Sequence, residues 1–341
     1  PASADTEPVS VIDTSALFSD RDLDGSYDES AAVHIQLEGE TAVCDSDAVS
    51  IDGSRITLLD EGTYLVSGAL TDGQIVVDAG DTDKVQIVLA GASLTCADSA
   101  AIYSKSADKV FLTLAEGTEN TLTNGGSYTA IDKNNIDSVV FSKTDLTLNG
   151  SGSLTIDAQA GHGVVSKDEL TITGGSYTVT AAEHGMTGKD SLAVAGGDFT
   201  IISGKDGLHA ENADDSALGF LYVADGTFTI TAQGDAVSAS GALQVDGGTF
   251  DLTTGGGSAS VTMTTGDSFA PGGMGGGPGG QDGAPLQGDP PAGGETPPEL
   301  PDNSGGGQLP ELPAQPSGSE TASAAETAEG TETAEGTVSQ A

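Results

Sequence analysis

The sequence contains no tryptophan, and its prolines are confined to the two ends of the chain. Two prolines lie at positions 1 and 8, eleven lie at or after Pro271, and none lies between. Because proline cannot donate to a central sheet ladder, a proline-free stretch of this length suits a continuous hydrogen-bonded sheet. The 50 glycines and abundant Thr, Ser and Asp are typical of a turn-rich, all-β protein rather than of a helical enzyme.

Positive charge is also scarce, since 10 Lys and Arg face 52 Asp and Glu, for a formal net charge of −42. Charge of this sign favours solubility and makes nucleic acid and anionic membrane surfaces poor partners. Divalent cations are good partners, because a hard cation such as Ca²⁺ relieves the repulsion between clustered carboxylates.

Long apolar runs are absent, so we expect no membrane span. The first residues, PASADTEPVS, are not a signal peptide, and we expect a secreted or cell-surface protein, lipid-anchored or wall-associated, whose targeting segment has been trimmed. The two cysteines, Cys44 and Cys96, have no metal-binding spacing. They are either two small buried residues or one disulfide.

The C-terminal part, residues 265–341, changes composition to Pro, Gly, Glu and Thr, with twelve carboxylates and neither lysine nor arginine. Such a segment cannot bury enough apolar surface to order itself. We predict a disordered acidic tail over 265–341, and the rest of the chain is strongly acidic in its own right.

Internal repeats organise the part before the tail. Tyr177, Phe199, Phe228 and Phe250 follow TGGS, AGGD, ADGT and DGGT at separations of 22, 29 and 22 residues, and the longer step contains the insertion ENADDSALGF. Alternating apolar residues flank each aromatic residue. They are Leu170 and Ile172, Leu192 and Val194, Leu221 and Val223, Leu243 and Val245 upstream, and Val179, Ile201, Ile230 and Leu252 downstream, with Val164, Met186, Leu208 and Val237 as a third contact.

Three short period-two segments therefore make one 22-residue unit, which must stack on its neighbours to bury its apolar face. This pattern predicts an all-β, single right-handed parallel β-helix over residues 33–264, with coils spaced ~4.8 Å apart. The aromatic residues should point inward and stack as core. Residues 1–32 should cap the first edge, whose backbone groups would otherwise be unpaired. Neither the leucine-rich repeat frame nor the calcium-binding nonapeptide GGxGxD is present.

A metal site is predicted where acidic residues crowd one turn and the insertion that follows it. The repeat places Asp235 directly above Asp206 on the next coil, which adds a carboxylate to the cluster. Oxygen ligands in this number suit Ca²⁺, although a solvated acidic loop would have the same composition. The predicted ligands are Asp206, Glu211, Asn212, Asp214, Asp215 and Asp235.

A second acidic stretch, SDRDLDGSYDES, places Asp20, Asp22, Asp24 and Gly25 like the opening of an EF-hand loop. Position twelve would be Ala31 instead of the bidentate Glu, and the flanks do not read as helices. We interpret it as an acidic, turn-forming segment, with a calcium site as the alternative.

Catalytic signatures are weak. GHG at 161–163 and ADD at 213–215 superficially resemble polygalacturonase motifs, but their order is reversed and the family's Arg-x-Lys clamp is missing. His162 and His184 share a repeat position with Asp206 and Asp235, which favours a ladder of turn residues. A pectate lyase needs a basic residue to abstract a proton, and here only Lys189 and Lys205 could serve.

Several motifs in order, DEGTYLVSGALTDGQIVVDA, DKVQIVLAGASL, AEGTENTLT, SKTDLTLNGSGSLTI and GKDGLHAEN, resemble a family of secreted bacterial carbohydrate-binding β-helix proteins known from clostridial cell surfaces. The resemblance implies a pectate-lyase-like β-helix that binds Ca²⁺ and plant cell-wall polysaccharide, without catalysis. The family's DGxHAEN run maps onto Asp206, Gly207, His209, Glu211 and Asn212. The second DG is altered here, with Ala236 after Asp235.

We therefore predict a non-enzymatic role for the chain: calcium-dependent binding of polygalacturonate or a cellulose-like polysaccharide at the bacterial cell surface, by a monomer. The charge of the chain supports the cation, because an acidic surface repels polygalacturonate unless cations bridge the carboxylates. The alternatives are a Lys-based, calcium-dependent pectate lyase and a structural surface adhesin or spacer.

Overall fold

A computed structural model of the chain describes residues 12–255. The chain divides into two units, Pro1–Ser268 and Phe269–Ala341, and every described residue belongs to the first. The predicted boundary at 264 and the predicted tail over 265–341 lie outside the described residues.

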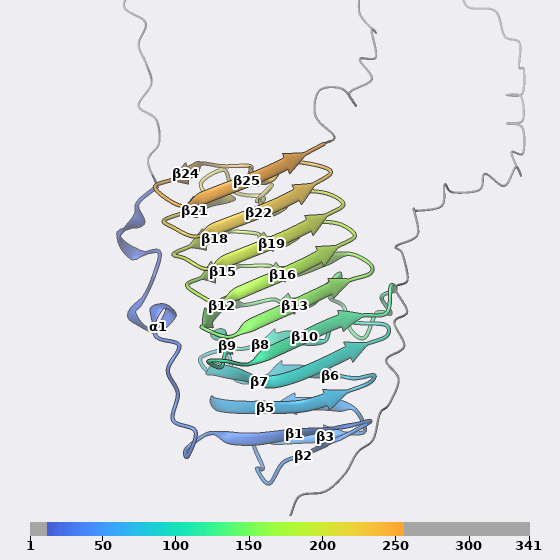
Figure 1. The fold of residues 1–341 in the computed structure, drawn as a ribbon. Coiled ribbons are helices and arrows are strands. Elements are labelled where there is room, and N and C mark those ends of the chain that lie inside the picture. The colour runs from blue at the N-terminus through green and yellow to red at the C-terminus, as the bar shows by residue number, and fades with distance from the viewer. Residues whose placement is uncertain (1–11, 256–341) are drawn as a thin grey trace, which may run out of the picture. The chain divides into compact units, whose positions relative to one another are not determined.

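The described residues form the predicted right-handed parallel β-helix, and one coil shows how it is built. The coil contains β15 (Glu169–Ile172), β16 (Ser176–Ala181) and β17 (Met186–Gly188), one strand for each of three faces. In Figure 1 the front strands run from left to right while the chain climbs from blue to orange, which is the right-handed sense. Parallel strands joined through such crossovers almost always adopt this hand.

Two of the three faces belong to a single 16-stranded sheet. They are joined because β5 (Gly62–Leu70) and β7 (Lys84–Cys96) are long enough to turn the corner and pair in both faces. In the next coil a turn interrupts the chain at this corner, so that two separate strands, β9 (Lys109–Leu114) and β10 (Glu119–Asn124), take the place of one long strand. The other strands of this sheet are β1 (Val33–Gly39), β2 (Ala42–Val43), β12 (Asp145–Gly150), β13 (Ser153–Ala158), β18 (Ser191–Val194), β19 (Asp198–Ser203), β21 (Phe220–Val223), β22 (Thr227–Ala232), β24 (Leu243–Val245) and β25 (Thr249–Thr254).

The third face is a separate nine-stranded sheet. Its strands pair in parallel except at the first edge, where β3 and β4 are antiparallel. Besides β17, the strands are β3 (Val49–Asp52), β4 (Arg55–Leu58), β6 (Gln74–Asp78), β8 (Ile102–Ser106), β11 (Ser138–Ser142), β14 (His162–Ser166), β20 (Leu208–Ala210) and β23 (Val237–Ala239).

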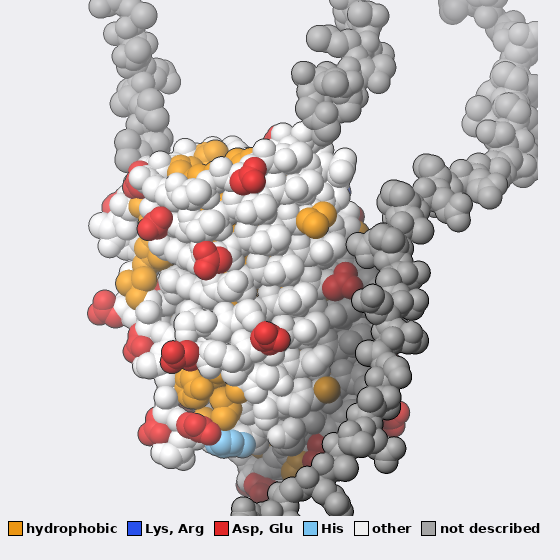
Figure 2. Space-filling view, viewed as in Figure 1, with side chains coloured by type: hydrophobic (Ala, Val, Ile, Leu, Met, Phe, Trp, Pro, Cys, Tyr) orange, Lys and Arg blue, Asp and Glu red, His pale blue; other side chains and the backbone are white. Residues whose placement is uncertain are grey.

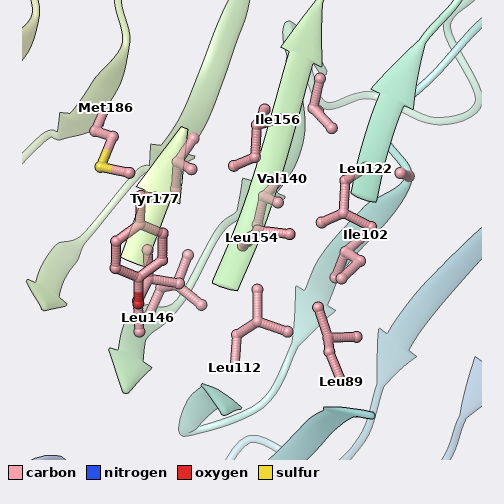
Figure 3. Close-up of a cluster of buried hydrophobic side chains, with 14 of the residues drawn as sticks. Leu89, Ile102, Leu112, Leu122, Val140, Leu146, Leu154, Ile156, Tyr177 and Met186 are labelled. Carbon is pink, nitrogen blue, oxygen red and sulfur yellow. The ribbon is translucent and has the colours of Figure 1, made fainter. Parts of the chain in front are cut away.

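The predicted aromatic ladder is confirmed. Tyr177, Phe199 and Phe228 are at most 2% exposed, and Phe250 packs partly buried at the end of the column. Adjacent ring centroids are 5.4, 4.8 and 4.7 Å apart, with ring planes within 16° of one another. Figure 3 shows a part of the interior near Tyr177, where aliphatic side chains from all three faces meet.

The prediction that residues 1–32 cap the first edge is wrong for the part that the structure describes. Residues 12–32 run as a strap along the side of the coils, from β24 down to β1, with a short 3-10 helix, η1 (Thr14–Ala16), and one helical turn, α1 (Asp20–Leu23) (Figure 1). Near the last coils the Ile12 amide donates to Gln244, and the Phe18 ring lies 6.1 Å from that of Tyr222. The first edge is closed instead by β2 and β3, which fold back antiparallel on β1 and β4.

A buried carboxylate attaches the strap to the coils. Asp22 is 2% exposed, and its carboxylate accepts a hydrogen bond from the hydroxyl of Ser19, the N-cap residue of α1. The carboxylate also accepts from the Thr147 hydroxyl at 2.5 Å and pairs with Lys109 Nζ at 2.7 Å. These contacts occupy both carboxylate oxygens of Asp22 and leave neither available to a metal ion. Asp24 accepts from the Ser26 amide as an ordinary turn residue, so this stretch is the acidic turn and not a calcium loop.

Cys44 and Cys96 are both free thiols, which decides between the two readings that the sequence left open. Cys96 is buried in the core, and burial is the main cause that raises its pKa. Neither of the two helices in residues 12–255 is long or apolar enough to cross a membrane.

Removing one ring from the aromatic ladder should destabilise the fold strongly. We expect Phe199→Ala to lower the free energy of unfolding by about 3–5 kcal/mol, because it leaves a cavity between two stacked rings. The neighbouring Thr200 faces solvent, and Thr200→Ala should change stability by less than about 1 kcal/mol. Urea unfolding monitored by circular dichroism measures both. Equal effects of the two variants would contradict an inward-facing ladder.

Removing the carboxylate of Asp22, which attaches the strap to the coils, should destabilise the fold by an amount that depends on pH. Burial raises the pKa of Asp22, but hydrogen bonds from Lys109, Ser19 and Thr147 outweigh burial and leave the pKa below its ordinary value. The carboxylate therefore stabilises the fold above the unfolded pKa of about 3.9, and this contribution is lost as the pH falls through the lower folded pKa.

We expect Asp22→Ala to cost about 3–5 kcal/mol at pH 7, because Lys109 is left half-buried without its partner. The penalty should shrink at pH values well below 4. Asp24→Ala, in the same strap but exposed, is the matched control and should cost less than about 1 kcal/mol. Urea unfolding at the two pH values tests the proposal, and a pH-independent penalty would argue against a charged anchor.

Candidate functional site

The outer face of the nine-stranded sheet changes character along the coils. One outward position per strand is aligned by the parallel register. On the early coils this position is apolar and is covered by the loop 125–137, whose Ile136 and Ile131 pack on Tyr103, Phe141 and Val165. On the later coils the position becomes polar and the loop no longer covers it. In chain order the position reads Val76, Tyr103, Phe141, Val165, Thr187, His209 and Ser238.

Where the loop ends, a polar groove of about 310 Å³ opens over β14, β17 and β20. Larger hollows lie at the first edge, beside Val33 and Cys44, at the last coil, beside Leu243 and Phe250, and between the strap and the coils, beside Tyr27, but they hold fewer titratable side chains. The groove is the hollow that gathers titratable side chains. It is lined by His162, Val165, Ser166, Lys167, Glu183, His184, Thr187, Lys189, Lys205, His209 and Glu211.

One wall of the groove is a hydrogen-bonded ladder that runs along the solenoid axis. Nδ1 of His162 accepts from the His184 amide at 3.1 Å, and Nδ1 of His184 accepts from the Asp206 amide at 3.1 Å. Oδ1 of Asp206 then accepts from the Asp235 amide at 2.8 Å. Each side chain thus binds the backbone one coil further on, which confirms the prediction that these four positions form a ladder of turn residues.

The ladder fixes the protonation state of its two histidines. Burial is the largest cause that lowers the pKa of His162 and of His184 to about 4, and for His184 the neighbouring histidines lower it further. Both imidazoles are therefore neutral near pH 7. Since Nδ1 accepts, the proton lies on Nε2. Nε2 of His162 lies 3.2 Å from Glu183 Oε2, while Nε2 of His184 has no hydrogen-bond partner within residues 12–255 and is a free donor lining the groove.

Three imidazoles stack across the groove. The ring of His184 lies 5.1 Å from that of His162 and 4.1 Å from that of His209, with planes within 18°. Stacked faces cover one another, so it is the ring edges that face a ligand. At the same place the Thr187 hydroxyl and Nδ1 of His209 are buried without a hydrogen bond. Buried polar atoms without a partner are uncommon in native proteins, and a bound hydroxyl could satisfy either side chain after a small rotation.

Three lysines surround the histidines, which is a high concentration for a chain with only 10 Lys and Arg. Lys205 Nζ pairs with Glu183 at 2.9 Å, Lys189 Nζ with Asp214 at 3.2 Å, and Lys167 Nζ with Asp137 at 3.6 Å. Figure 2 shows a different face of the molecule, where acidic side chains are scattered and no Lys or Arg is visible. The groove therefore offers ammonium donors and carboxylate acceptors side by side, unlike the face in Figure 2, where the charged side chains in view are acidic.

The structure does not assemble the predicted calcium site. Asp206 and Asp235 are neighbours, as the repeat predicted. The side-chain oxygen of Asn212, however, accepts hydrogen bonds from the amides of Asp214 and Asp215, and its side-chain nitrogen donates to Asp190 at 2.6 Å. Asp215 accepts from the Ala217 amide, Asp214 is 83% exposed beside Lys189, and Glu211 lies beside His209. No three of these five carboxylates bring oxygens within 4.8 Å of one another in the described part.

The reason is the length of β20. This strand of three residues stands between Asp206 and the insertion, and at about 3.3 Å per residue it separates the two acidic groups by roughly 10 Å. Within the insertion, local turn hydrogen bonds then take the side-chain oxygens that a cation would need. The six residues therefore do not fit Ca²⁺ as a single site.

A different trio, His184, Asp206 and His209, brings potential ligand atoms within 4.8 Å. Asp206 Oδ2 lies 2.8 Å from Nδ1 of His209, although the two are not aligned for a hydrogen bond, and 3.4 Å from Nδ1 of His184. The lone pair of His184 Nδ1 is already used by the Asp206 amide. The two stacked rings also direct their in-plane lone pairs side by side and not toward a common point. His184 and Asp206 belong to the ladder, and the trio is a poor metal site.

Sequence reasoning found the ladder but missed the groove. Lys167 and Lys189 are 22 residues apart, as are Glu183 and Lys205, so the repeat itself contained the signal. Nothing in the repeat indicated that the loop 125–137 would cover the early coils and leave the later ones open.

The described residues thus form a β-solenoid with one polar, grooved face. A family model described as carbohydrate-binding domain-containing protein matches residues 52–279, and the chain belongs to this family. This agrees with the resemblance seen in the sequence motifs.

Two relatives from clostridia support the assignment. A carbohydrate-binding domain-containing protein of Acetivibrio thermocellus is 38% identical over 137 residues, which are 40% of this chain and 48% of the relative, so the match spans about half of that protein. The solved structure of a polysaccharide lyase-like protein from C. thermocellum, a gadolinium derivative, superposes with a TM-score of 0.59 at 33% identity. It covers 65% of this chain and 94% of the other.

The histidine ladder predicts an unusual titration. His162 and His184 should titrate near pH 4 instead of 6.5, because burial disfavours the charged form. The unfolded chain takes up these protons near pH 6.5 and the folded chain does not, so stability should fall as the pH drops from about 6.5 to 4. NMR titration of the imidazole Hε1 signals measures this, with single His→Asn variants to assign them. Midpoints of His162 and His184 near 6.5 would contradict the ladder.

Proposed function

We propose that the groove over β14, β17 and β20 binds plant cell-wall polysaccharide, acidic or cellulose-like, without catalysis, on a secreted or cell-surface protein. Membership in the carbohydrate-binding family supports polysaccharide as the ligand class. The observation that carries the choice of site is the concentration of donors, acceptors and unsatisfied polar atoms in one hollow.

The side chains of the groove match the chemistry of a sugar ring. Sugar hydroxyls donate and accept at once, so they suit a surface where lysine ammonium groups and Nε2 of His184 donate while Glu183 and Glu211 accept. A uronate adds a carboxylate to each residue, and Lys167, Lys189 and Lys205 would exchange their exposed ion pairs for it. Such pairs are worth at most about 1 kcal/mol, so the exchange costs little.

The structural neighbour is a polysaccharide lyase-like protein, which supports a lyase as the alternative. The geometry around the two candidate bases favours binding. Lys189 and Lys205 are each ion-paired with a carboxylate, an arrangement that presents a proton donor and not a base. The two arginines of the chain, Arg21 and Arg55, lie in the strap and on the first coil, away from the groove lining.

Calcium dependence is a separate proposal. A cation bridging protein and uronate carboxylates remains the alternative to direct contact with the lysines, although no assembled ligand set supports it. The two make opposite predictions for chelation.

Removing positive charge from the groove should weaken the binding of polygalacturonate. We expect Lys189→Gln and Lys205→Gln each to raise the dissociation constant about tenfold, since a hydrogen bond to a charged group contributes about 1.5–3 kcal/mol. Arg55→Gln is the matched control, because it removes one exposed charge on the first coil, four strands from β14. Isothermal titration with polygalacturonate and with a soluble cellulose oligomer measures each affinity. Equal losses for the control and the groove variants would reject the site.

The same titration separates the alternatives. With EDTA present, direct binding through lysines should persist, whereas loss of binding would favour a calcium bridge. Incubation with polygalacturonate and Ca²⁺ while following the absorbance of an unsaturated product tests the lyase. An absorbance increase that Lys189→Ala or Lys205→Ala abolishes would contradict binding without catalysis and would identify a lyase.

A further inference from the structure

We propose that the groove extends into a track of lysines along which one linear uronate polymer lies lengthwise, parallel to the solenoid axis. This inference rests on the proposed function and adds the direction of the bound chain and two contacts outside the groove, Lys143 and Lys105.

The backbone register places one lysine on each of four successive coils. The amides of Lys143, Lys167 and Lys189 donate to the carbonyls of Ser104, Ser142 and Ser166. Each acceptor serine comes directly before the lysine of the preceding coil, so each lysine is aligned with the lysine one coil earlier. The aligned lysines at this corner of the solenoid are Lys105, Lys143, Lys167 and Lys189. With strands about 4.8 Å apart, the four Cα positions span roughly 14 Å. The next coil replaces lysine with Glu211, which ends the track.

The ammonium groups of the track can be recruited by a ligand. Lys143 is exposed and makes no ion pair within residues 12–255. Lys105 pairs with Asp78 at 2.5 Å, Lys167 reaches across the Phe141 ring to Asp137, and Lys189 pairs with Asp214. These three side chains are each about two-fifths exposed, so their ion pairs are weak and exchangeable.

The surroundings of the track confine an anionic chain to it. Asp145, Asp168 and Asp190 follow the lysines on the same coils. Burial raises the pKa of Asp168, and repulsion from Asp145 and Asp190 raises it further, which shows how closely these carboxylates crowd. The protein as a whole carries a net charge of −42. A polyanion that leaves the lysines therefore meets repulsion, whereas one that follows them meets a cation on every coil.

The track predicts an effect of ligand length. Lys143→Gln and the double variant Lys105→Gln/Lys143→Gln should bind a galacturonate trimer as tightly as the unchanged protein does, because the groove lysines are intact. The double variant should bind a galacturonate decamer about tenfold more weakly. Lys133→Gln, which removes an exposed charge from the covering loop at 125–137, and Arg55→Gln are the controls and should bind both oligomers normally.

Isothermal titration of the full chain with each oligomer distinguishes the outcomes. If Lys189→Gln weakens the trimer but the double variant leaves the decamer unchanged, the groove stands and the track is rejected. If Lys189→Gln leaves the trimer unchanged as well, the proposed function itself fails. A decamer of neutral glucose units should be insensitive to Lys105→Gln and Lys143→Gln, and equal sensitivity of the neutral and acidic decamers would overturn a track that binds carboxylates.

Discussion

The in-register hydrogen bonding of successive coils is the constraint on which the rest of the molecule depends. It brings residues 22 positions apart to a spacing of about 4.8 Å, so whatever side chain recurs at one position becomes a column. Inside the solenoid this makes the stacked rings of Tyr177, Phe199, Phe228 and Phe250. On the outside the same rule makes the ladder of His162, His184, Asp206 and Asp235 and the sequence of lysines at the neighbouring corner. The columns of the core and those of the outer surface thus follow from the same repeat.

Insertions turn the uniform solenoid into one with a defined site. The loop 125–137 buries the outward residues of the early coils, and the coil that follows opens where Thr187 and His209 replace apolar side chains. The insertion after β20 places Asp214 beside Lys189 at the far rim. A perfectly regular solenoid would present the same surface at every coil, so it is the interruptions that give the groove its ends.

Period alone sufficed to predict the β-helix, its start near Val33, the inward aromatic residues and the ladder positions, because these follow from which residues share a place in the repeat. The strap could not be predicted in this way. Residues 12–32 have no repeat, and the bond between Asp22 and Thr147 joins positions 125 residues apart. The calcium cluster failed for a related reason: proximity in sequence was taken as proximity in space, whereas β20 separates Asp206 from Asn212 and the turn of the insertion uses the oxygens of Asn212.

The ladder also decides which groups can supply positive charge to a ligand. His162 and His184 must keep Nδ1 unprotonated to accept the backbone of the next coil, and burial holds their pKa values near 4. In a protonated imidazole Nδ1 carries a hydrogen and cannot accept from the backbone N–H group of the next coil. Protonation of either histidine therefore breaks its hydrogen bond in the ladder. At pH values well above 4 these two histidines are consequently neutral, with the proton on Nε2. Positive charge at this surface comes from the lysines. The proposed orientation of an acidic polymer therefore rests on their alignment from coil to coil and not on the histidine cluster.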